Sequence, residues 1–267
     1  VQTCALPIYA ADDACAKQFF AKVGRLLYRR PITERELATP VKAAHDFANE
    51  TKDFYEGIGQ GLSGVMTTPE FLFVADTTEK ASDGSLKLTN YAKASRLSFL
   101  LWNTTPDDLL LAAAEKGELD KSSGLKREDD RMIASPRTDR GLRAFFKDFL
   151  DFPKFDTLEK DPVIYPVYGL RTTEDAKEQI LRTAVDHLLV SNSDYRDLFT
   201  TRKTFITPSL ARIYHVPTQF PDGGWSAYEF PEGDTRAGLL TQIGFVAANA
   251  HPGRSSPTLR GKAIREL

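Results

Sequence analysis

The segment from His251 to Lys262 concentrates basic and hydroxyl side chains at a position where a new helix is expected to begin. Ser256 is a good N-cap residue, and Pro257 suits the first helical position. The free backbone N–H groups at such a helix start favour an anion, and Arg254 and Arg260 can reach the same space. Because arginine grips an anion through two parallel hydrogen bonds, the segment predicts a site for a carboxylate, a phosphate or a haem propionate.

A purely structural interpretation of the same residues stands beside this one. Ser256 then only caps the helix, and the arginines pair with acidic neighbours. His251 lies on the loop before the helix, where it could act as an acid, a base or an axial ligand. The candidate anion-binding residues are therefore His251, Arg254, Ser255, Ser256 and Arg260.

The four histidines are too far apart in sequence to predict a metal site. They are His45, His187, His215 and His251, and they form no HxxxH or HxxEH grouping. His187 follows Asp186 on a predicted helix, but neighbours one position apart point away from each other. We therefore predict no metal site in this chain.

Other patterns that resemble catalytic motifs have structural explanations. Gly57, Gly59 and Gly61 fall within a predicted helix, without the strand, turn and helix that a phosphate loop requires, so they favour close helix packing. Asp107 and Asp108 lie at a helix start, where the helix dipole accounts for them. No GxSxG elbow is present, so the catalytic residues stay unknown and the sequence does not decide whether the protein is an enzyme.

Both ends of the sequence indicate a fragment of a longer protein. Val1–Ile8 has no periodicity and resembles a translated sequencing adapter, so we exclude it from the fold prediction. Cys4 falls within that segment, which leaves Cys15 as the one native cysteine. Cys15 is then either a small buried residue of the first helix or one half of a disulfide with a missing segment. At the other end, the chain stops at Leu267 inside the helix that Ser256 begins.

The composition indicates a globular protein with no strong preference for a charged partner. The 267 residues allow one large domain or two small ones, and 41% of them are hydrophobic. Lys and Arg number 35 against 37 Asp and Glu, which argues against nucleic acid or an anionic membrane as a partner. No apolar run is long enough to span a bilayer, and no signal peptide is visible. Because we expect both ends to be truncated, that absence does not argue against export.

Helical periodicity and capping signals dominate the chain, so we predict an all-α fold. Its expected form is a bundle-like array of many helices with irregular connections rich in proline and aromatic residues, of which 152–171 is the longest. The segment 77–87 reads as a loop, 71–74 is ambiguous, and 221–233 is a loop or a short hairpin. Helices are expected at 14–29, 33–49, 54–66, 89–102, 105–117, 125–134, 136–150, 173–189, 198–214, 239–250 and from 256 onward.

These elements suggest three domains after the excluded residues 1–8. An N-terminal three-helix unit occupies 9–76, a central helical domain occupies 88–218, and a truncated C-terminal domain begins at 236 and continues to 267. The polar segment between the first two is the expected boundary.

Six motifs occur together in one known family, in the same order as here. The sequence resembles the consecutive domains of unknown function DUF1595, DUF1592 and, truncated, DUF1588, found in large exported proteins of planctomycete and myxobacterial type that are often linked to cytochrome c modules. The resemblance spans Cys15 to Leu267. The motifs are Tyr28–Thr33 with Glu36 and Leu37, Thr68–Phe73, Ala94–Trp102, Thr204–Ile206 with Leu210 and Ala211, Gly238–Gln242, and His251–Lys262.

The resemblance implies a compartment and a setting, and it establishes no catalytic residue. It implies a periplasmic or secreted protein, whose haem c lies beyond this fragment in a Cys-x-x-Cys-His motif that the sequence does not contain. Partners would be the other domains of the parent chain and cytochrome c modules. Export also favours a disulfide at Cys15. We expect a helical module of a redox-associated multidomain protein; the alternative is a non-catalytic scaffold or interaction domain.

Overall fold

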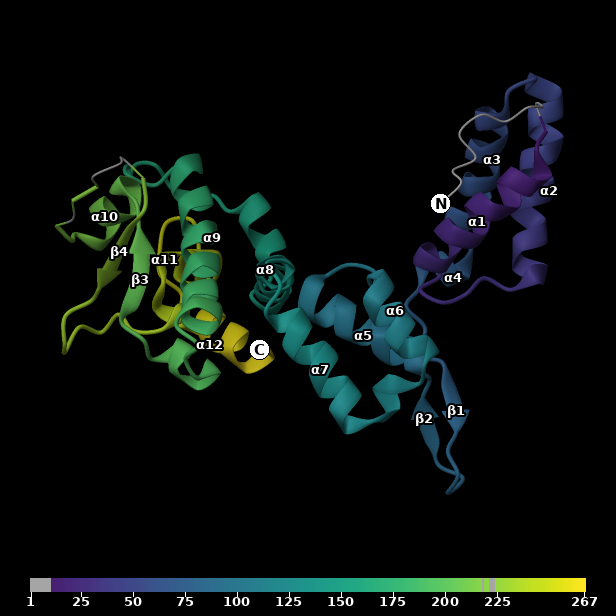
Figure 1. Cartoon of the computed structure of the whole chain (residues 1–267). Coiled ribbons are helices and arrows are strands. Elements are labelled where there is room, and N and C mark those ends of the chain that lie inside the picture. The colour runs from purple at the N-terminus through teal and green to yellow at the C-terminus, as the bar shows by residue number, and fades with distance from the viewer. Residues whose placement is uncertain (1–10, 218, 221–223) are drawn as a thin grey trace. The chain divides into compact units, whose positions relative to one another are not determined.

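The structure is a computed structural model that describes residues 11–217, 219–220 and 224–267. The predicted all-α class is confirmed, because the described part is mostly helical, with two small antiparallel sheets (Figure 1). The chain divides into two compact units, Val1–Thr138 and Asp139–Leu267, each with its own cores. The suspected adapter, residues 1–8, lies outside the described residues. No helix in the described ranges combines the length and apolar character that a membrane span requires.

The N-terminal unit begins with the three predicted helices: α1 (Asp13–Leu27), α2 (Glu34–Thr51) and α3 (Phe54–Met66). At the start of α2 the predicted capping box is present in full. The helices enclose a core of buried residues: Ala16, Phe20, Tyr28, Leu37, Ala44 and Val65.

Glycines allow α3 to pack closely against α2, as the sequence predicts. A Cβ atom at Gly61 would lie 2.5 Å from Cζ of Phe20 and 2.6 Å from the carbonyl oxygen of Pro40. One at Gly57 would clash with the carbonyl oxygen of Ala44. The two glycines therefore set the distance between the helices.

A buried arginine fixes the chain that follows α3. The ambiguous segment 71–74 is the end of a short helix, α4 (Pro69–Leu72), followed by extended chain. Arg29, only 8% exposed, donates hydrogen bonds to the carbonyl oxygens of Leu27, Glu70, Phe71 and Phe73. Because a buried guanidinium needs its donors satisfied, this residue holds α4 against the end of α1.

The next segment contains a hairpin that the sequence did not predict. The expected loop 77–87 includes β1 (Thr78–Lys80), which pairs antiparallel with β2 (Leu86–Leu88), and Gly84 has a φ of 83° in the turn between them. The alternation of side chains is too short to be recognised as strand without the pairing.

Helices complete the N-terminal unit around Trp102, which is 1% exposed. Its indole donates to the carbonyl oxygen of Met132 at 3.0 Å, and the guanidinium groups of Arg131 and Arg137 lie over its ring, 5.5 and 5.0 Å from the centroid. The elements are α5 (Asn90–Trp102), α6 (Asp108–Glu115), η1 (Glu118–Asp120) and α7 (Ser122–Ile133).

One helix start in this region differs from the prediction. Asp107 caps α6, accepting a hydrogen bond from the backbone N–H of Leu110, so the helix begins later than predicted from Thr105. The hydroxyl of Thr105 instead donates to the carbonyl oxygen of Leu26 at 2.9 Å. Thr105, which the sequence predicts as the N-cap, therefore makes a tertiary contact instead.

The C-terminal unit is built around α9 (Leu170–Val185), which starts earlier than the predicted Thr173. Before it come α8 (Arg137–Phe149), whose first two residues belong to the other unit, and η2 (Phe152–Thr157) within the predicted irregular connection. The buried core residues are Phe146, Leu150, Phe152, Phe155, Ile180, Leu181, Ala184, Leu198, Leu239, Phe245 and Ala263.

A second small sheet lies beside α9 (Figure 1). The region predicted as short helices, 198–214, also contains a strand, β3 (Lys203–Ile206), which pairs with β4 (Ser226–Glu229) in the register Thr204 opposite Tyr228. The strand was missed because its partner lies far along the chain. Around it are η3 (Asp186–Val190), η4 (Tyr195–Phe199) and α10 (Pro208–Tyr214).

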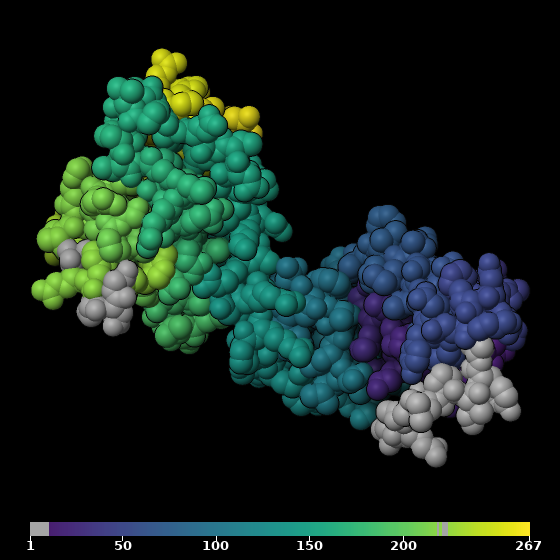
Figure 2. Space-filling model, turned by 90° about the horizontal axis from the view of Figure 1, so that it is seen from above, coloured from purple at the N-terminus to yellow at the C-terminus, as the bar shows by residue number. Residues whose placement is uncertain are grey.

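The final segment contains three short elements. The predicted helix 239–250 is divided at Gln242, which has extended backbone (φ −67°, ψ 147°), into η5 (Leu239–Thr241) and α11 (Ile243–Ala248). The last helix, α12 (Pro257–Glu266), begins at Ser256 as predicted and lies at the surface of its unit (yellow in Figure 2).

Candidate functional site

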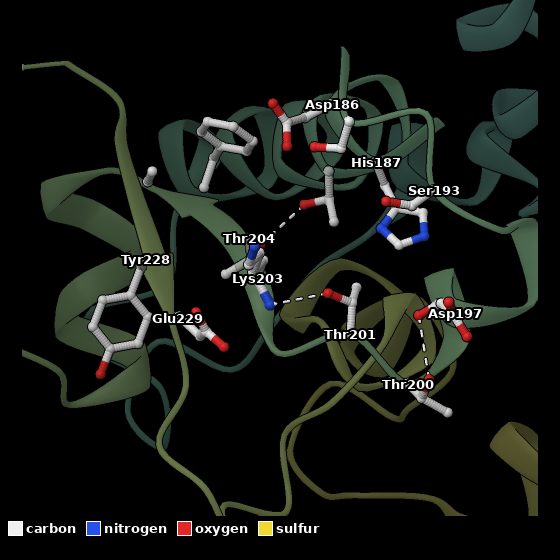
Figure 3. Close-up of a pocket in the computed structure, with 14 residues that line it drawn as sticks. Asp186, His187, Ser193, Asp197, Thr200, Thr201, Lys203, Thr204, Tyr228 and Glu229 are labelled. Atoms are coloured by element: carbon white, nitrogen blue, oxygen red, sulfur yellow. Dashed lines mark hydrogen bonds between the residues drawn. The ribbon is translucent and has the colours of Figure 1, made fainter. Parts of the chain in front are cut away.

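A cavity of about 720 Å³ opens beside the C-terminal end of α9 (Figure 3), which is within the usual range for small-molecule sites. Side chains from the end of α9, from η3 and η4 and from the paired strands β3 and β4 surround it. The lining residues are Thr183, Asp186, His187, Ser191, Ser193, Asp197, Thr200, Thr201, Lys203, Thr204, Phe205, Ala227, Tyr228 and Glu229.

A π-helical turn brings Asp186 and His187 to this cavity together. In η3 the backbone N–H of Ser191 bonds to the carbonyl oxygen of Asp186, five residues earlier, at 2.7 Å. This wider turn places both side chains along the cavity, although the sequence predicted that neighbouring helical residues would point apart. Single π turns are frequent at functional sites.

The hydrogen bonding of His187 determines where its proton lies when the ring is neutral. Its Nε2 atom is 2.9 Å from the carbonyl oxygen of Asp194. A carbonyl oxygen can only accept, so Nε2 carries the hydrogen, and Nδ1 keeps the lone pair of the neutral ring. His187 is therefore a half-buried acceptor at the edge of the cavity.

The charge around the cavity is predominantly negative. Three carboxylates, those of Asp186, Asp197 and Glu229, line it together with one ammonium group, that of Lys203. Glu229 lies 3.5 Å from Nη2 of Arg202. Within the described ranges, Asp186 and Lys203 have no side-chain ion pair, so both are available to a ligand.

Two threonines in the cavity lining, Thr183 and Thr204, belong to a buried polar cluster with Gln179 and Gln242. The hydroxyl of Thr183 donates to the carbonyl oxygen of Gln179 at 2.8 Å. Thr204, 3.0 Å away, must therefore give its own proton to Thr183. Gln242 Nε2 then supplies hydrogen bonds to both hydroxyls, at 3.1 and 3.2 Å, and Gln179 Nε2 supplies another to Thr204 at 3.2 Å. Each hydroxyl and amide donor in the cluster thus has an assigned acceptor.

Tyr214 extends the cluster toward α11. Its hydroxyl donates to Oε1 of Gln179 at 2.8 Å and accepts from the backbone N–H of Ile243 at 2.7 Å. Burial raises the pKa of Tyr214 to about 12, so the phenol stays protonated as a donor at neutral pH. The cluster thus links α9, β3, α10 and the start of α11 through buried hydrogen bonds.

The predicted anion site at α12 has its residues close together, but with internal partners. Ser256, 7% exposed, caps the helix by accepting from the N–H of Leu259 at 3.3 Å. Arg260 Nη1 donates to Oγ of Ser255 at 2.9 Å. Arg254 forms no ion pair in the described part of the chain and pairs through its backbone with His251 in an isolated bridge.

Hydrogen bonds join the loop before α12 to the irregular connection, residues 152–171. Lys160 Nζ donates to the carbonyl oxygens of Ala250 and His251, at 3.3 and 3.1 Å, and burial lowers the pKa of this lysine. The His251 side chain is exposed, and His251 does not line the cavity of about 720 Å³. The anion site and the cavity are thus different places in the C-terminal unit, and the anion site stays a prediction.

Cys15 lies in the first turn of α1 and is 5% exposed. Cys4, the other cysteine of the sequence, lies outside the described residues. The prediction of a disulfide partner in a missing segment therefore stays a prediction.

Sequence reasoning missed the cavity, because its lining comes from segments that become neighbours only when β3 pairs with β4. The available signal was local: the polar run 191–194 comes shortly after Asp186 and His187 at the end of an amphipathic helix. In the described ranges, no group of three or more His, Cys, Asp or Glu side chains could hold a metal ion.

Comparison with known families identifies two domains. Residues 15–76 match the family described as PSD5, protein of unknown function (DUF1595), and residues 88–216 match PSD4, protein of unknown function (DUF1592). The chain therefore contains two consecutive domains of unknown function. No curated protein and no solved structure matches it.

Proposed function

We propose that the C-terminal unit binds a small, neutral, hydroxyl-rich ligand, such as a sugar, in the cavity beside η3. The lining of that cavity is the observation that carries the proposal, since carboxylates and Ser and Thr hydroxyls surround a volume suited to a small molecule. Carboxylates accept hydrogen bonds from ligand hydroxyls, and their excess of negative charge disfavours an anion. Phe205 adds an apolar face.

A comparison of two related sugars tests this proposal. We expect cellobiose to bind and glucuronate, which carries a carboxylate, to bind at least tenfold more weakly in calorimetric titrations. Asp186→Asn should weaken cellobiose binding, because it replaces one acceptor oxygen of a half-buried carboxylate by an NH2 donor and removes the negative charge. Asp148→Asn, on the exposed surface of α8 in the same unit, is the matched control. Equal binding of both sugars, or no effect of Asp186→Asn, would contradict the proposal.

For the full-length protein we infer an exported, periplasmic or secreted molecule in which this chain is a helical module linked to cytochrome c. Two consecutive domain matches, in the order expected from the resemblance, support this inference. Haem c would then be held elsewhere in the parent chain, and the segment from residue 236 would begin a third domain. An absorption spectrum of the purified full-length protein should contain a Soret band, and its absence would refute the haem linkage.

Exposed apolar side chains support the alternative, a scaffold or interaction domain. Leu72 and Phe73 are 59% and 65% exposed, and Val163 and Leu170 are 87% and 81% exposed. Where exposed apolar side chains form a contiguous patch, they mark protein-contact surfaces. A scaffold would bind another domain of the parent chain without any small ligand, and Phe73→Ser would weaken that binding. The two functions are therefore separated by titrating the chain with a sugar and with the remaining domains.

The anion site at the start of α12 has its own test. Replacing Arg254 and Arg260 together by alanine should abolish binding of inorganic phosphate, measured by titration, because both guanidinium groups would be lost from the helix start. Arg265→Ala, at the exposed end of the same helix, should leave it unchanged. Identical titration curves for the double variant and the unmodified protein would reject the site.

A further inference from the structure

Two buried polar atoms beneath β3 have no hydrogen-bond partner among the described protein atoms. They are Oε1 of Gln242 and Nε of Arg202. Gln242 is only 4% exposed, so its amide oxygen cannot turn to bulk solvent. Native proteins satisfy nearly all buried polar groups, because an unmet one costs as much as a lost hydrogen bond.

Both residues line one small cavity of about 10 Å³. Thr204 and Gly238 also line it, so it lies next to the polar cluster below the larger cavity. About 10–15 Å³ of such volume accommodates one water molecule. The space is therefore large enough for one small occupant.

The orientation of the Gln242 amide is not free to change. Its Nε2 donates to the hydroxyls of Thr183 and Thr204, whose own protons are already given to Gln179 and Thr183. A flipped amide would place an oxygen against two hydroxyls with no proton left to donate. Gln242 therefore offers a bare acceptor, and Arg202 offers an N–H donor.

We infer that this cavity is the binding site of one internal water molecule, which bridges Oε1 of Gln242 and Nε of Arg202. Size and charge limit the occupant: a chloride is larger than a water molecule and would face the amide oxygen, and a metal cation would face the guanidinium groups of Arg202 and Arg236. A neutral molecule that donates and accepts satisfies both orphan groups, and only water is small enough.

The water has a consequence for the larger cavity. Arg202 also places Nη2 3.5 Å from Oε1 of Glu229, and Glu229 lines that cavity. The water connects the fixed amide of Gln242 to Arg202 and thus holds Arg202 where it meets Glu229. Arg202 is a positioning residue in this arrangement. The inference concerns solvent alone and stands whether or not the larger cavity binds a sugar.

A crystal structure of the unmodified chain tests the site directly. We expect one isolated density peak within hydrogen-bond distance of both Gln242 Oε1 and Arg202 Nε, with no anomalous signal after a sodium bromide soak. Continuous protein density closing the cavity, or a bromide peak at that position, would overturn the inference.

Magnetic relaxation dispersion of the solvent tests the same site in solution, because it counts long-lived internal waters. Arg202→Met should lose one such water relative to the unmodified protein. Arg212→Met, on the exposed face of α10, is the control and should lose none. An unchanged count in folded Arg202→Met would contradict the assignment, and if that variant does not fold, the crystal structure of the unmodified chain decides.

Discussion

At the scale of single residues, Glu36 shows how one carboxylate helps to cap the N-terminus of a helix, here α2. It accepts hydrogen bonds from the backbone N–H of Thr33 at 2.8 Å and from Arg30 Nη2 at 2.7 Å. The hydrogen bond from Arg30, with help from Thr33, lowers the pKa of Glu36 to about 2. The folded chain thus stabilises the ionised carboxylate of Glu36 more than the unfolded chain does.

This shift predicts an acid dependence of stability. Because the folded pKa lies below the unfolded value, the contribution is complete above about pH 5 and is lost as the pH falls toward 2. Glu36→Gln should lower the free energy of unfolding by about 1 kcal/mol at pH 7 and reduce its decline between pH 5 and 2. Urea denaturation at several pH values measures both effects, and the exposed Glu50→Gln is the control. An unchanged pH profile in Glu36→Gln would show that Glu36 does not carry the effect.

The residues that the sequence identifies correctly are those whose partners are close in the chain. Thr33 and Ser256 cap helices by bonding to N–H groups three residues away, so their types and spacing suffice. Asp186 and His187 depend on a π turn, and Thr204 meets the cavity because β3 pairs with a strand about twenty residues later. Apart from the polar run 191–194 that follows η3, nothing local distinguishes these residues from an ordinary polar surface.

At the scale of elements, the packing of α2 against α3 depends on two glycines and not on the third. A methyl group at Gly61 would meet Phe20 and the backbone of Pro40, whereas at Gly59 no atom beyond the adjacent residues and the local helix backbone lies within 4 Å of the position that it would take. Gly59 is therefore an internal control for substitutions at Gly57 and Gly61.

Gly61→Ala should lower the free energy of unfolding by about 1–3 kcal/mol, because the helices must separate. Gly59→Ala should raise it by about 0.5–1 kcal/mol, since alanine restricts the unfolded chain without a clash. Chemical denaturation of both variants measures the difference. Equal effects of the two substitutions would mean that the glycines act only through helix propensity.

Helices were predictable and strands were not, for a physical reason. An amphipathic helix such as α9 repeats its apolar positions over four turns, so periodicity alone reveals it. The strands are three or four residues long, and what stabilises them is pairing across the chain. The division of the predicted helix 239–250 at Gln242 has a similar origin, because that residue's side chain is held in the buried cluster.

At the scale of the whole molecule, the boundary between compact units does not follow the predicted domains. The units meet at Thr138, inside α8 and inside the predicted central domain 88–218. The family matches cover residues 15–76 and 88–216, while the units describe where the chain packs on itself. Each unit buries its own cores: Phe20 and Trp102 lie in the N-terminal unit, and Phe146 and Tyr214 lie in the C-terminal one.

Separate cores predict separate unfolding of the two units. Gly61→Ala should lower the temperature of one calorimetric transition by several degrees and leave a second unchanged, because only α2 and α3 are disturbed. Phe146→Ala should do the reverse, since it empties a fully buried position in the C-terminal core at a cost of about 3–5 kcal/mol. Differential scanning calorimetry of the unmodified chain and both variants measures the shifts. A single transition displaced by both substitutions would instead show that the units unfold together, with the continuous helix α8 coupling their cores.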